Sequence, residues 1–567
     1  MHLDISRVTL ASGKIYRRAL LRESFRQGGK VCKRTIANLS HLTDVQLEAL
    51  QVVLRHEGPE PLAIASRDEV ALTQGKSIGA VATVLAVAER LGIRAALGDD
   101  RQGLLALYQV LARVIDQGSR LSAVRLGREH ALAELLGLSR LDEDDLYANL
   151  EWLHARQALI EDRLFASRCA AAGGRPNLFL YDVTSSYFEG TDNALAAFGY
   201  NRDGKKGKKQ VVAGLLTDQD GTPLTIELFP GNTADPTTVP SQVAKLRQRF
   251  GGGELTLVGD RGMLKAPQQQ LLAEADMHYL TAITKPQLQT LLKRGVLQLE
   301  LFEQALAEVI DPQSGKRYLL RRNPDQAARL AHRRDDQLAT WQRHLERANR
   351  YLAEHPKAAV ATALRSLAAR ASRLKLSPWL SATATGRQLH EVIDQAARAE
   401  AARLDGCYVL ETDLPPAVAD KATLDKRYHD LAQVEWAFRT CKTAHLELRP
   451  IYLRDEQRTR GHALVVMLAY QVVRHLADCW HALDTTVEEA LAKLGQLCTC
   501  DIHLADGTTL HELPQPRAST AQLLAAAQVQ LPALLPPRSA AVDTTRKLPP
   551  RRKYRNQNAL HNPPQRR

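Results

Sequence analysis

The chain has 567 residues, and 76 Lys and Arg against 63 Asp and Glu give it a formal charge of +13. This length exceeds what one hydrophobic core supports, so we expect several domains. No stretch reaches the ~18 uncharged apolar residues of a membrane span, and the first residues lack the apolar segment of a signal peptide. Seven cysteines in this length are no disulfide framework. A membrane protein and a secreted disulfide-rich protein are therefore excluded, and we expect a cytoplasmic location.

The positive charge is concentrated in two segments. Residues 321–380 hold thirteen Lys and Arg against five acids, and residues 538–567 hold nine against one. The rest of the chain is close to neutral. Contacts to phosphate groups are the simplest use of two such basic elements. The alternative is a solvated helix face and a basic tail with no partner.

Hydrophobic periodicity and turn residues divide the chain into seven regions. In chain order these are a small α+β segment at 1–60, a mainly helical region at 61–175, the first part of a mixed α/β region at 176–285, an insertion with basic helices at 286–404, the second part of the α/β region at 405–482, a mixed closing segment at 483–535 and a disordered basic tail at 536–567. The helical region is our candidate for DNA binding.

The α/β region begins with three predicted antiparallel strands, the second and third joined across Gln219-Asp220-Gly221. Helices and strands then alternate, which indicates a mixed sheet. Within the insertion we expect short strands at LQLELF and RYLLRRN and a long basic helix over about 324–375. Two strong helices, at about 421–444 and 455–480, follow.

Three carboxylates stand out. Asp182 and Asp260 each lie at the end of a predicted strand, where a buried charge must be paired or bind a metal ion. For either residue alone, a turn or a helix cap is the simpler interpretation. Glu435 lies on a predicted helix, where rotation by ~100° per residue places it on one face with Arg439 and Lys442, with Tyr428 nearby. The alternative for Glu435 is an ordinary surface pair with Arg439.

Taken together, the three carboxylates can converge on hard divalent cations, which prefer oxygen ligands. Four blocks resemble the DDE transposases of bacterial insertion sequences: Tyr181-Asp182-Val183-Thr184, the Pro230–Asp235 segment, Gly259-Asp260-Arg261-Gly262, and Tyr428-x6-Glu435-x6-Lys442. The closest likeness is to the group whose glutamate helix carries a Tyr–Arg–Glu–Lys signature. The resemblance extends to the N-terminal SFRQGGKVCKRTIANLS segment and to Arg460-Gly461-His462.

The resemblance implies an RNase H-like α/β core interrupted by a large insertion, with a mainly helical N-terminal domain and a disordered basic tail. It implies that Asp182, Asp260 and Glu435 bind two Mg²⁺ ions, with Mn²⁺ as the alternative. The implied reaction is hydrolysis at the ends of the element followed by strand transfer. The implied partners are terminal inverted repeats and target DNA, the assembly a homodimer on DNA, and the location the bacterial nucleoid.

The signature implies DNA contacts by Tyr428, Arg439 and Lys442. Leu431 stands where the signature has Arg, and Arg427 and Arg439 are the candidates to replace it. From the residues themselves, a loop with Lys205, Lys206, Lys208 and Lys209 is a further DNA-contact candidate. Asn232, Asp235 and Arg261 are candidates for a supporting polar role. We expect Trp436 to pack in the core, and the Cys498-x-Cys500-x2-His503 spacing argues weakly for zinc.

Two rival functions remain open from the sequence. The first is a host-adapted nuclease of the same fold that cuts DNA without joining it. The second is a catalytically inactive DNA-binding protein. The intact set of three carboxylates argues against the second, since binding alone does not need them.

Overall fold

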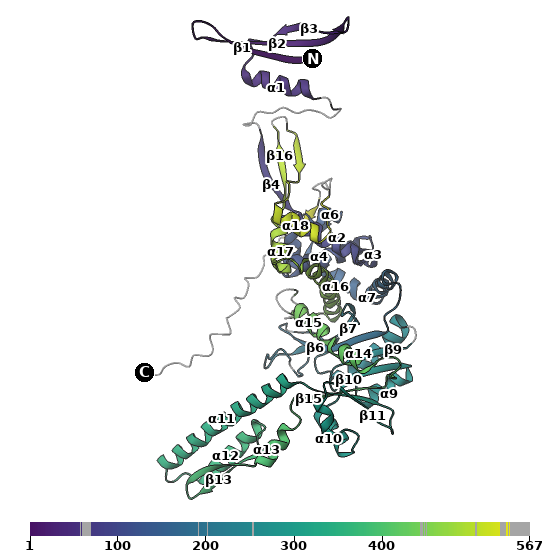
Figure 1. Ribbon diagram of the computed structural model, residues 1–567, viewed down its shortest axis with the longest axis vertical. Coiled ribbons are helices and arrows are strands. Elements are labelled where there is room, and N and C mark those ends of the chain that lie inside the picture. The colour runs from purple at the N-terminus through teal and green to yellow at the C-terminus, as the bar shows by residue number, and fades with distance from the viewer. Residues whose placement is uncertain are drawn as a thin grey trace. The chain divides into compact units, whose positions relative to one another are not determined.

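The computed structural model describes residues 1–56, 58, 70–190, 192–200, 202–251, 254–442, 446, 448, 451–504, 507–532, 540–542 and 544 (Figure 1). Most of the expected basic tail at 536–567 lies outside these residues. Contacts divide the chain into two units, the first formed by 1–75 and 498–515 and the second by 76–497 and 516–567. No described helix is long and apolar enough to cross a lipid bilayer.

The first unit contains two small sheets and one helix. Its elements are β1 (His2–Thr9), β2 (Ile15–Gln27), β3 (Lys30–Asn38), α1 (Asp44–Arg55), β4 (Ala71–Ser77), β16 (Cys498–His503) and β17 (Thr509–Glu512). The tight turn between β2 and β3 uses Gly28 and Gly29, both at positive φ, as a two-residue hairpin requires. Thr43 begins α1 with a capping box to Gln46.

The second unit begins with a helical region whose residues bury one large core. Its helices are α2 (Gly79–Arg90), α3 (Ile93–Leu97), α4 (Arg101–Ile115), α5 (Arg120–Glu129), α6 (Leu132–Leu135) and α7 (Glu143–Ala172). Later in the chain α16 (Glu456–Trp480), α17 (Val487–Leu494) and α18 (Ala518–Ala526) join them. A short strand β18 (Ala541–Val542), inside the expected tail, pairs with β5 (Arg140–Leu141).

An eight-stranded mixed sheet forms the middle of this unit, in the order β11-β12-β15-β10-β9-β6-β7-β8. Its strands are β6 (Leu178–Tyr187), β7 (Gln210–Asp218), β8 (Pro223–Pro230), β9 (Leu255–Gly259), β10 (Met277–Ala282), β11 (Ala307–Ile310), β12 (Arg317–Arg322) and β15 (Cys407–Thr412). Only β6–β9 and β9–β10 are parallel. The mixed sheet is thus confirmed, and it includes two strands, β11 and β12, from the range that we expected to be insertion.

The two faces of the sheet bury different cores, because successive side chains point to opposite sides of a strand. Phe179, Leu257 and Tyr279 pack with α8 (Val239–Lys245) and α9 (Ala266–Glu274) on one face. Leu180 and Val258 pack in the core of the other face, which contains α15 (Leu431–Lys442) and α16. Asp182 and Asp260 share the alternation of Leu180 and Val258, so they belong to the face of α15.

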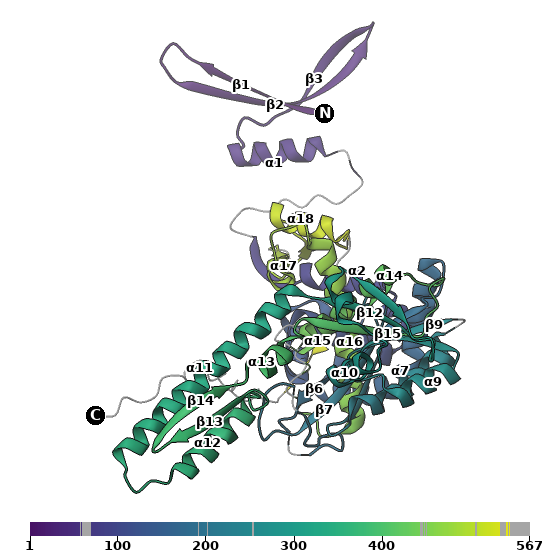
Figure 2. The same cartoon turned by 60° about the horizontal axis from the view of Figure 1, so that its bottom comes forward.

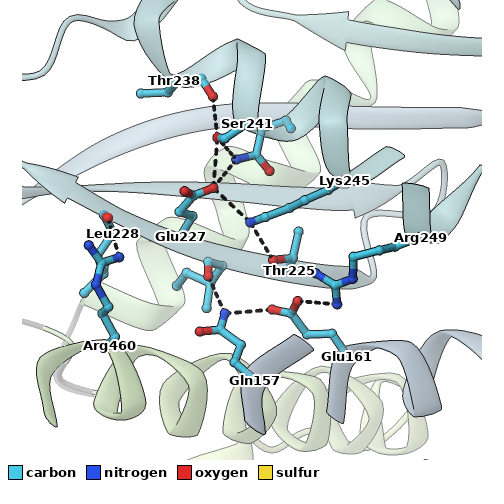
Figure 3. Close-up of polar contacts among 12 residues, drawn as sticks. Gln157, Glu161, Thr225, Glu227, Leu228, Thr238, Ser241, Lys245, Arg249 and Arg460 are labelled. Carbon is cyan, nitrogen blue, oxygen red and sulfur yellow. Dashed lines mark hydrogen bonds and ion pairs between the residues drawn. The ribbon is translucent and has the colours of Figure 1, made fainter. Parts of the chain in front are cut away.

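Side chains from helices protect the edge strand β8 (Figure 3). Gln157 of α7 donates to Ile226 O at 2.7 Å, and Arg460 of α16 donates to Leu228 O at 2.7 Å. Glu227 accepts from Lys245 of α8 at 2.9 Å. The bonds to the Ile226 and Leu228 carbonyl oxygens satisfy outward backbone groups of β8 that could otherwise pair with another strand. They also hold β8 and α8 at either end of the 231–238 segment.

The insertion proper forms a helical arm with a core of its own, which extends from the sheet in both views (Figures 1 and 2). After α10 (Lys285–Lys293), the arm consists of α11 (Pro324–Glu354), α12 (Val360–Arg373), β13 (Leu380–Thr385), β14 (Gln388–Ile393) and α13 (Gln395–Ala402). The basic helix that we expected over 324–375 is therefore two helices, because His355–Ala359 break it. LQLELF was wrongly expected as a strand, since Leu299–Glu303 form a 3₁₀ turn.

The predicted helix at 421–444 is also divided. It begins as α14 (Lys421–His429), and α15 follows after Asp430. Tyr428 and Glu435 therefore lie on different helices. The next predicted helix, at 455–480, is α16 as expected.

Candidate active site

The two aspartates lie on neighbouring strands. Tyr181 of β6 pairs with Gly259 of β9 in parallel register, so Asp182 and Asp260 follow side by side. Adjacent strand backbones are roughly 5 Å apart. Asp260 directly follows the end of β9, as expected, whereas β6 continues for five residues beyond Asp182. Gly262 has a φ of 79° and turns the chain after Asp260.

The environment of Asp182 disfavours the ionised form of its carboxyl group. Asp182 accepts a hydrogen bond from the Val183 N–H at 2.7 Å. Burial, followed by the negative charges of Asp260 and Glu435, raises the pKa of Asp182 to about 7, and the positive charge of Arg202 acts in the opposite direction. Repulsion among close carboxylates is the environment that a bound cation relieves.

Glu435 approaches the aspartates from α15, which packs on β6 (Figure 1). Val434 and Phe438 are buried and hold the helix on the sheet face, whereas the Glu435 side chain is exposed. The influence of Glu435 on the pKa of Asp182 places the two carboxylates within electrostatic range. The sheet and the helix thus bring all three predicted carboxylates to one face.

A buried ion pair joins the glutamate helix to the first aspartate strand. Lys442 Nζ lies 2.9 Å from Asp203 Oδ1 and donates to Thr184 Oγ1 at 2.8 Å. Asp203 also accepts from the Tyr187 N–H of β6 at 3.0 Å. The side chains of Lys442 and Asp203 are 10% and 2% exposed. Lys442, which we expected at DNA phosphate, is therefore engaged inside the protein.

Tyr428 orients the second aspartate from α14. Its hydroxyl donates to Asp260 Oδ1 at 3.4 Å, and burial together with Asp260 raises the pKa of Tyr428 above its ordinary value. Asp425 anchors α14 by accepting from Arg321 of β12 at 2.6 Å and from Tyr408 of β15 at 3.0 Å. β12 directly precedes the arm in the chain and β15 directly follows it. The arm and α14 are therefore attached to the same two strands.

Arg202 is a site residue that the sequence analysis missed. Its guanidinium donates to both oxygens of Asp235 at 2.7 and 2.6 Å, and its backbone N–H donates to Ser185 Oγ at 3.0 Å. Asp235 lies along the chain between β8 and α8. Asp235 therefore supports the site through Arg202, which agrees with its expected supporting role. No motif in the sequence identifies the pair.

The remaining candidates lie at the rim. Lys205 lies over the Tyr187 ring, and Lys208 pairs with Glu189 at 2.9 Å, so two of the four loop lysines are attached to the end of β6. The other predicted residues that are exposed are Lys206, Lys209, Asn232, Arg261 and Arg439. Their exposure leaves them accessible to a ligand.

The donor chemistry of the three carboxylates fits a hard divalent cation. Burial first, and then the other two carboxylates, raise the pKa of Asp182, and a bound cation would offset the repulsion among the three. Among the residues that the structure describes, however, no three His, Cys, Asp or Glu side chains are gathered closely enough to hold one ion. This statement includes Cys498, Cys500 and His503, so the structure gives no support to a zinc site there.

Trp436 does not pack in the core as expected, since 46% of it is exposed. It lines a cavity of about 260 Å³ with Tyr470, Gln433 and Arg474. Arg474 donates to Thr222 Oγ1 at 2.9 Å at the β7–β8 turn, so the cavity wall is tied to the sheet.

The chain is similar to known proteins over most of its length. The family described as "Transposase DDE domain" matches residues 173–472, and "IS1634 family transposase, N-terminal domain" matches residues 5–61. No curated protein matches the chain. A similar solved structure is the cryo-EM structure of a piggyBac transposase synaptic complex with hairpin DNA, at 8% identity and a TM-score of 0.33, covering 76% of this chain and 70% of that one. A likeness of that size carries no further weight.

Proposed function

Because the chain belongs to the DDE transposases of insertion sequences, we propose that it binds the terminal inverted repeats of its element, cuts the DNA there and joins the freed ends to target DNA. The observation that carries this proposal is the common face of Asp182, Asp260 and Glu435. The mixed sheet with a carboxylate helix on one face is consistent with an RNase H-like core. Coordinated cutting of two ends calls for a homodimer on DNA.

Asp182 and Asp260 would hold the divalent cations, and Glu435 would complete one of the two sites. Bound Mg²⁺, or Mn²⁺ in its place, would supply an activated nucleophile and stabilise the leaving oxygen of a phosphodiester. Asp182 has to be ionised to serve as a ligand, so its raised pKa means that binding a cation releases a proton from part of the molecules at neutral pH.

The protein residues contribute mainly position and charge. Tyr428 holds the Asp260 carboxylate, and the Lys442–Asp203 pair holds α15 against β6. Arg439 lies one turn after Glu435, and Arg261 directly follows Asp260. Both are exposed, as are Lys206 and Lys209, and all four would be available to DNA phosphate. In this proposal Lys442 positions the glutamate helix α15 on the sheet. A contact between Lys442 and DNA would require the Lys442–Asp203 ion pair to break.

Cleavage and strand transfer should be assayed on duplexes that carry the inverted repeats flanking the open reading frame, with Mg²⁺ present. We expect the wild-type protein to cut and join them, and Asp182→Ala, Asp260→Ala and Glu435→Ala to lose both activities while still binding DNA. Glu274→Ala is a matched control, because this exposed acid is on α9, which packs on the opposite face of the sheet from the carboxylates.

Other outcomes would select a rival. Cutting without joining would indicate a nuclease of the same family. Binding without cutting by the wild-type protein would indicate an inactive DNA-binding protein. Cutting by the triple alanine variant at the wild-type rate would overturn the site assignment itself.

A further inference from the structure

The arm carries an unusual concentration of unpaired cations. Residues 343–375 contain eight Lys and Arg and two acids. The structure describes this segment throughout, and none of the eight cations forms an ion pair with a carboxylate there. Elsewhere in the arm, Arg398 of α13 forms an ion pair with Asp335 of α11, and Arg334 of α11 forms one with Asp405. In the N-terminal half of α11, carboxylates therefore neutralise arginines. Within these described residues the cations of the C-terminal half of α11 and of α12 outnumber the two acids, Glu346 and Glu354, and form no ion pair with them.

Four of these cations, together with His344, make up a surface that we call the arm face. It consists of Arg343, His344 and Arg347 of α11, Arg370 of α12, and Arg373, which lies one turn after Arg370 on the same helix. Burial, then Arg370, Arg347 and Arg343, lower the pKa of His344, so the arginines of both helices act on the same point. Within the described residues, the Nε of Arg370 is buried without a hydrogen-bond partner.

The arm face is turned away from the β13–β14 hairpin. Gln342 donates to Glu391 of β14 at 2.9 Å, and Asn349 donates to Leu389 O at 2.9 Å, so that side of α11 is covered. His344 lies two residues after Gln342, a rotation of ~200° about the helix axis. Trp341 donates to Leu367 O at 3.1 Å and packs α11 against α12. The α11 members of the arm face therefore lie away from the side of the helix that the hairpin covers.

We infer that the arm face binds the phosphodiester backbone of DNA. Four of its five members are arginines, whose planar guanidinium matches phosphate oxygens in paired hydrogen bonds. Uncompensated like charges on one surface repel each other, and a polyanion relieves that repulsion. The inference rests on the proposed function for its ligand, since a chain that transposes DNA presents duplex to its surface. It adds a contact surface separate from the carboxylates.

The test compares two triple variants of the full-length protein that each remove three charges from the arm. R347Q/R370Q/R373Q changes the arm face. K357Q/R365Q/K375Q is the matched control, because Lys357 and Lys375 lie beyond the ends of α11 and α12, Arg365 is rotated by ~140° from Arg370, and all three are exposed. Duplex DNA binding is measured by fluorescence anisotropy in EDTA at several salt concentrations, and circular dichroism checks that each variant is folded.

Each phosphate contact contributes roughly 0.9 to the slope of log K against log salt. We expect the arm-face variant to lower that slope by about 2 to 3 and to weaken binding at least tenfold at moderate salt. The control should change the slope by less than one contact. Equal effects of the two variants would show only general electrostatic attraction and overturn the assignment. An unchanged affinity in the arm-face variant would do the same and would direct attention to an acidic protein as the partner.

R347Q/R373Q retains the half-buried Arg370 and serves if the triple variant does not fold. Its expected loss is about two contacts. Binding in EDTA is independent of cleavage, so failure of the two proposals can be told apart. A wild-type protein that binds DNA through the arm face but never cuts it would overturn the proposed function and leave the arm face standing.

Discussion

Lys442 Nζ of α15 lies 2.9 Å from the Asp203 carboxylate, which is itself held by the backbone of β6. The pair links the helix of Glu435 with the strand of Asp182, on which Thr184 receives a further bond from Lys442. Lys442, the lysine of the expected signature, thus helps to hold the Glu435 helix against the Asp182 strand.

Removing Lys442 should therefore damage the fold more than DNA binding. Lys442→Met leaves Asp203 buried without its partner, which typically costs about 3–5 kcal/mol. Lys442→Met/Asp203→Asn should recover part of that loss. Urea denaturation measures both variants, and the double-mutant cycle gives the coupling energy. A full loss of DNA affinity with unchanged stability would instead assign Lys442 to phosphate.

The metal-free protein should gain stability from Asp182→Asn at high pH. The folded pKa of Asp182, about 7, lies above the unfolded value of about 3.9. A raised carboxyl pKa means that ionisation opposes folding, so the wild-type protein loses stability as pH rises from about 4 to about 7. Asparagine removes that penalty, on the order of 4 kcal/mol at pH 8. Thermal melts in EDTA should show the difference at pH 8 and little of it at pH 4.

Addition of Mg²⁺ should reverse this order. A cation that binds only the folded wild-type protein raises its melting temperature with concentration. Asp182→Asn lacks one ligand and should respond weakly. If Mg²⁺ shifts both proteins equally, the ion does not bind at Asp182.

Arg202 and Asp235 should behave as one functional unit. Arg202→Gln and Asp235→Asn each remove the charge-assisted hydrogen bonds from the Arg202 guanidinium to the two Asp235 carboxylate oxygens. Each variant should therefore lower the cleavage rate by a similar factor. The double variant should be no worse than either single one, since the second change has nothing left to break. Multiplicative losses in cleavage assays would show that the two residues act separately.

The arm should unfold without the sheet. Trp341 is fully buried in the arm core, and Trp341→Ala should cost that core about 3–5 kcal/mol. Hydrogen exchange is expected to accelerate in α11 and α12 while β6 and β9 remain protected. Leu180→Ala, in the core of the sheet face, is the contrasting control and should weaken protection across the sheet. Uniform loss of protection in Trp341→Ala would contradict an independent arm core.

Local patterns in the sequence were sufficient for elements whose chemistry is local. The Gly28-Gly29 turn and the Thr43 cap were predictable because backbone geometry and a short-range hydrogen bond decide them. Break points were harder. The break at His355–Ala359 has a local signal, because Pro356 lacks a backbone N–H and disfavours the helical conformation at His355, and our expected helix over 324–375 overlooked it. The division between α14 and α15 at Asp430 has no proline or glycine to mark it.

The sequence by itself determined the family, the mixed sheet and three carboxylates in register with its strands and helix. Their spacing and side-chain alternation are properties of the chain alone. Only the tertiary structure decided what surrounds them. Lys442 forms an ion pair with Asp203, and Arg202, which acts on Asp182, donates hydrogen bonds to Asp235. Strands β11 and β12 join the sheet. These relations join residues far apart along the chain, and burial and charge pairing across such distances arise only when the chain folds.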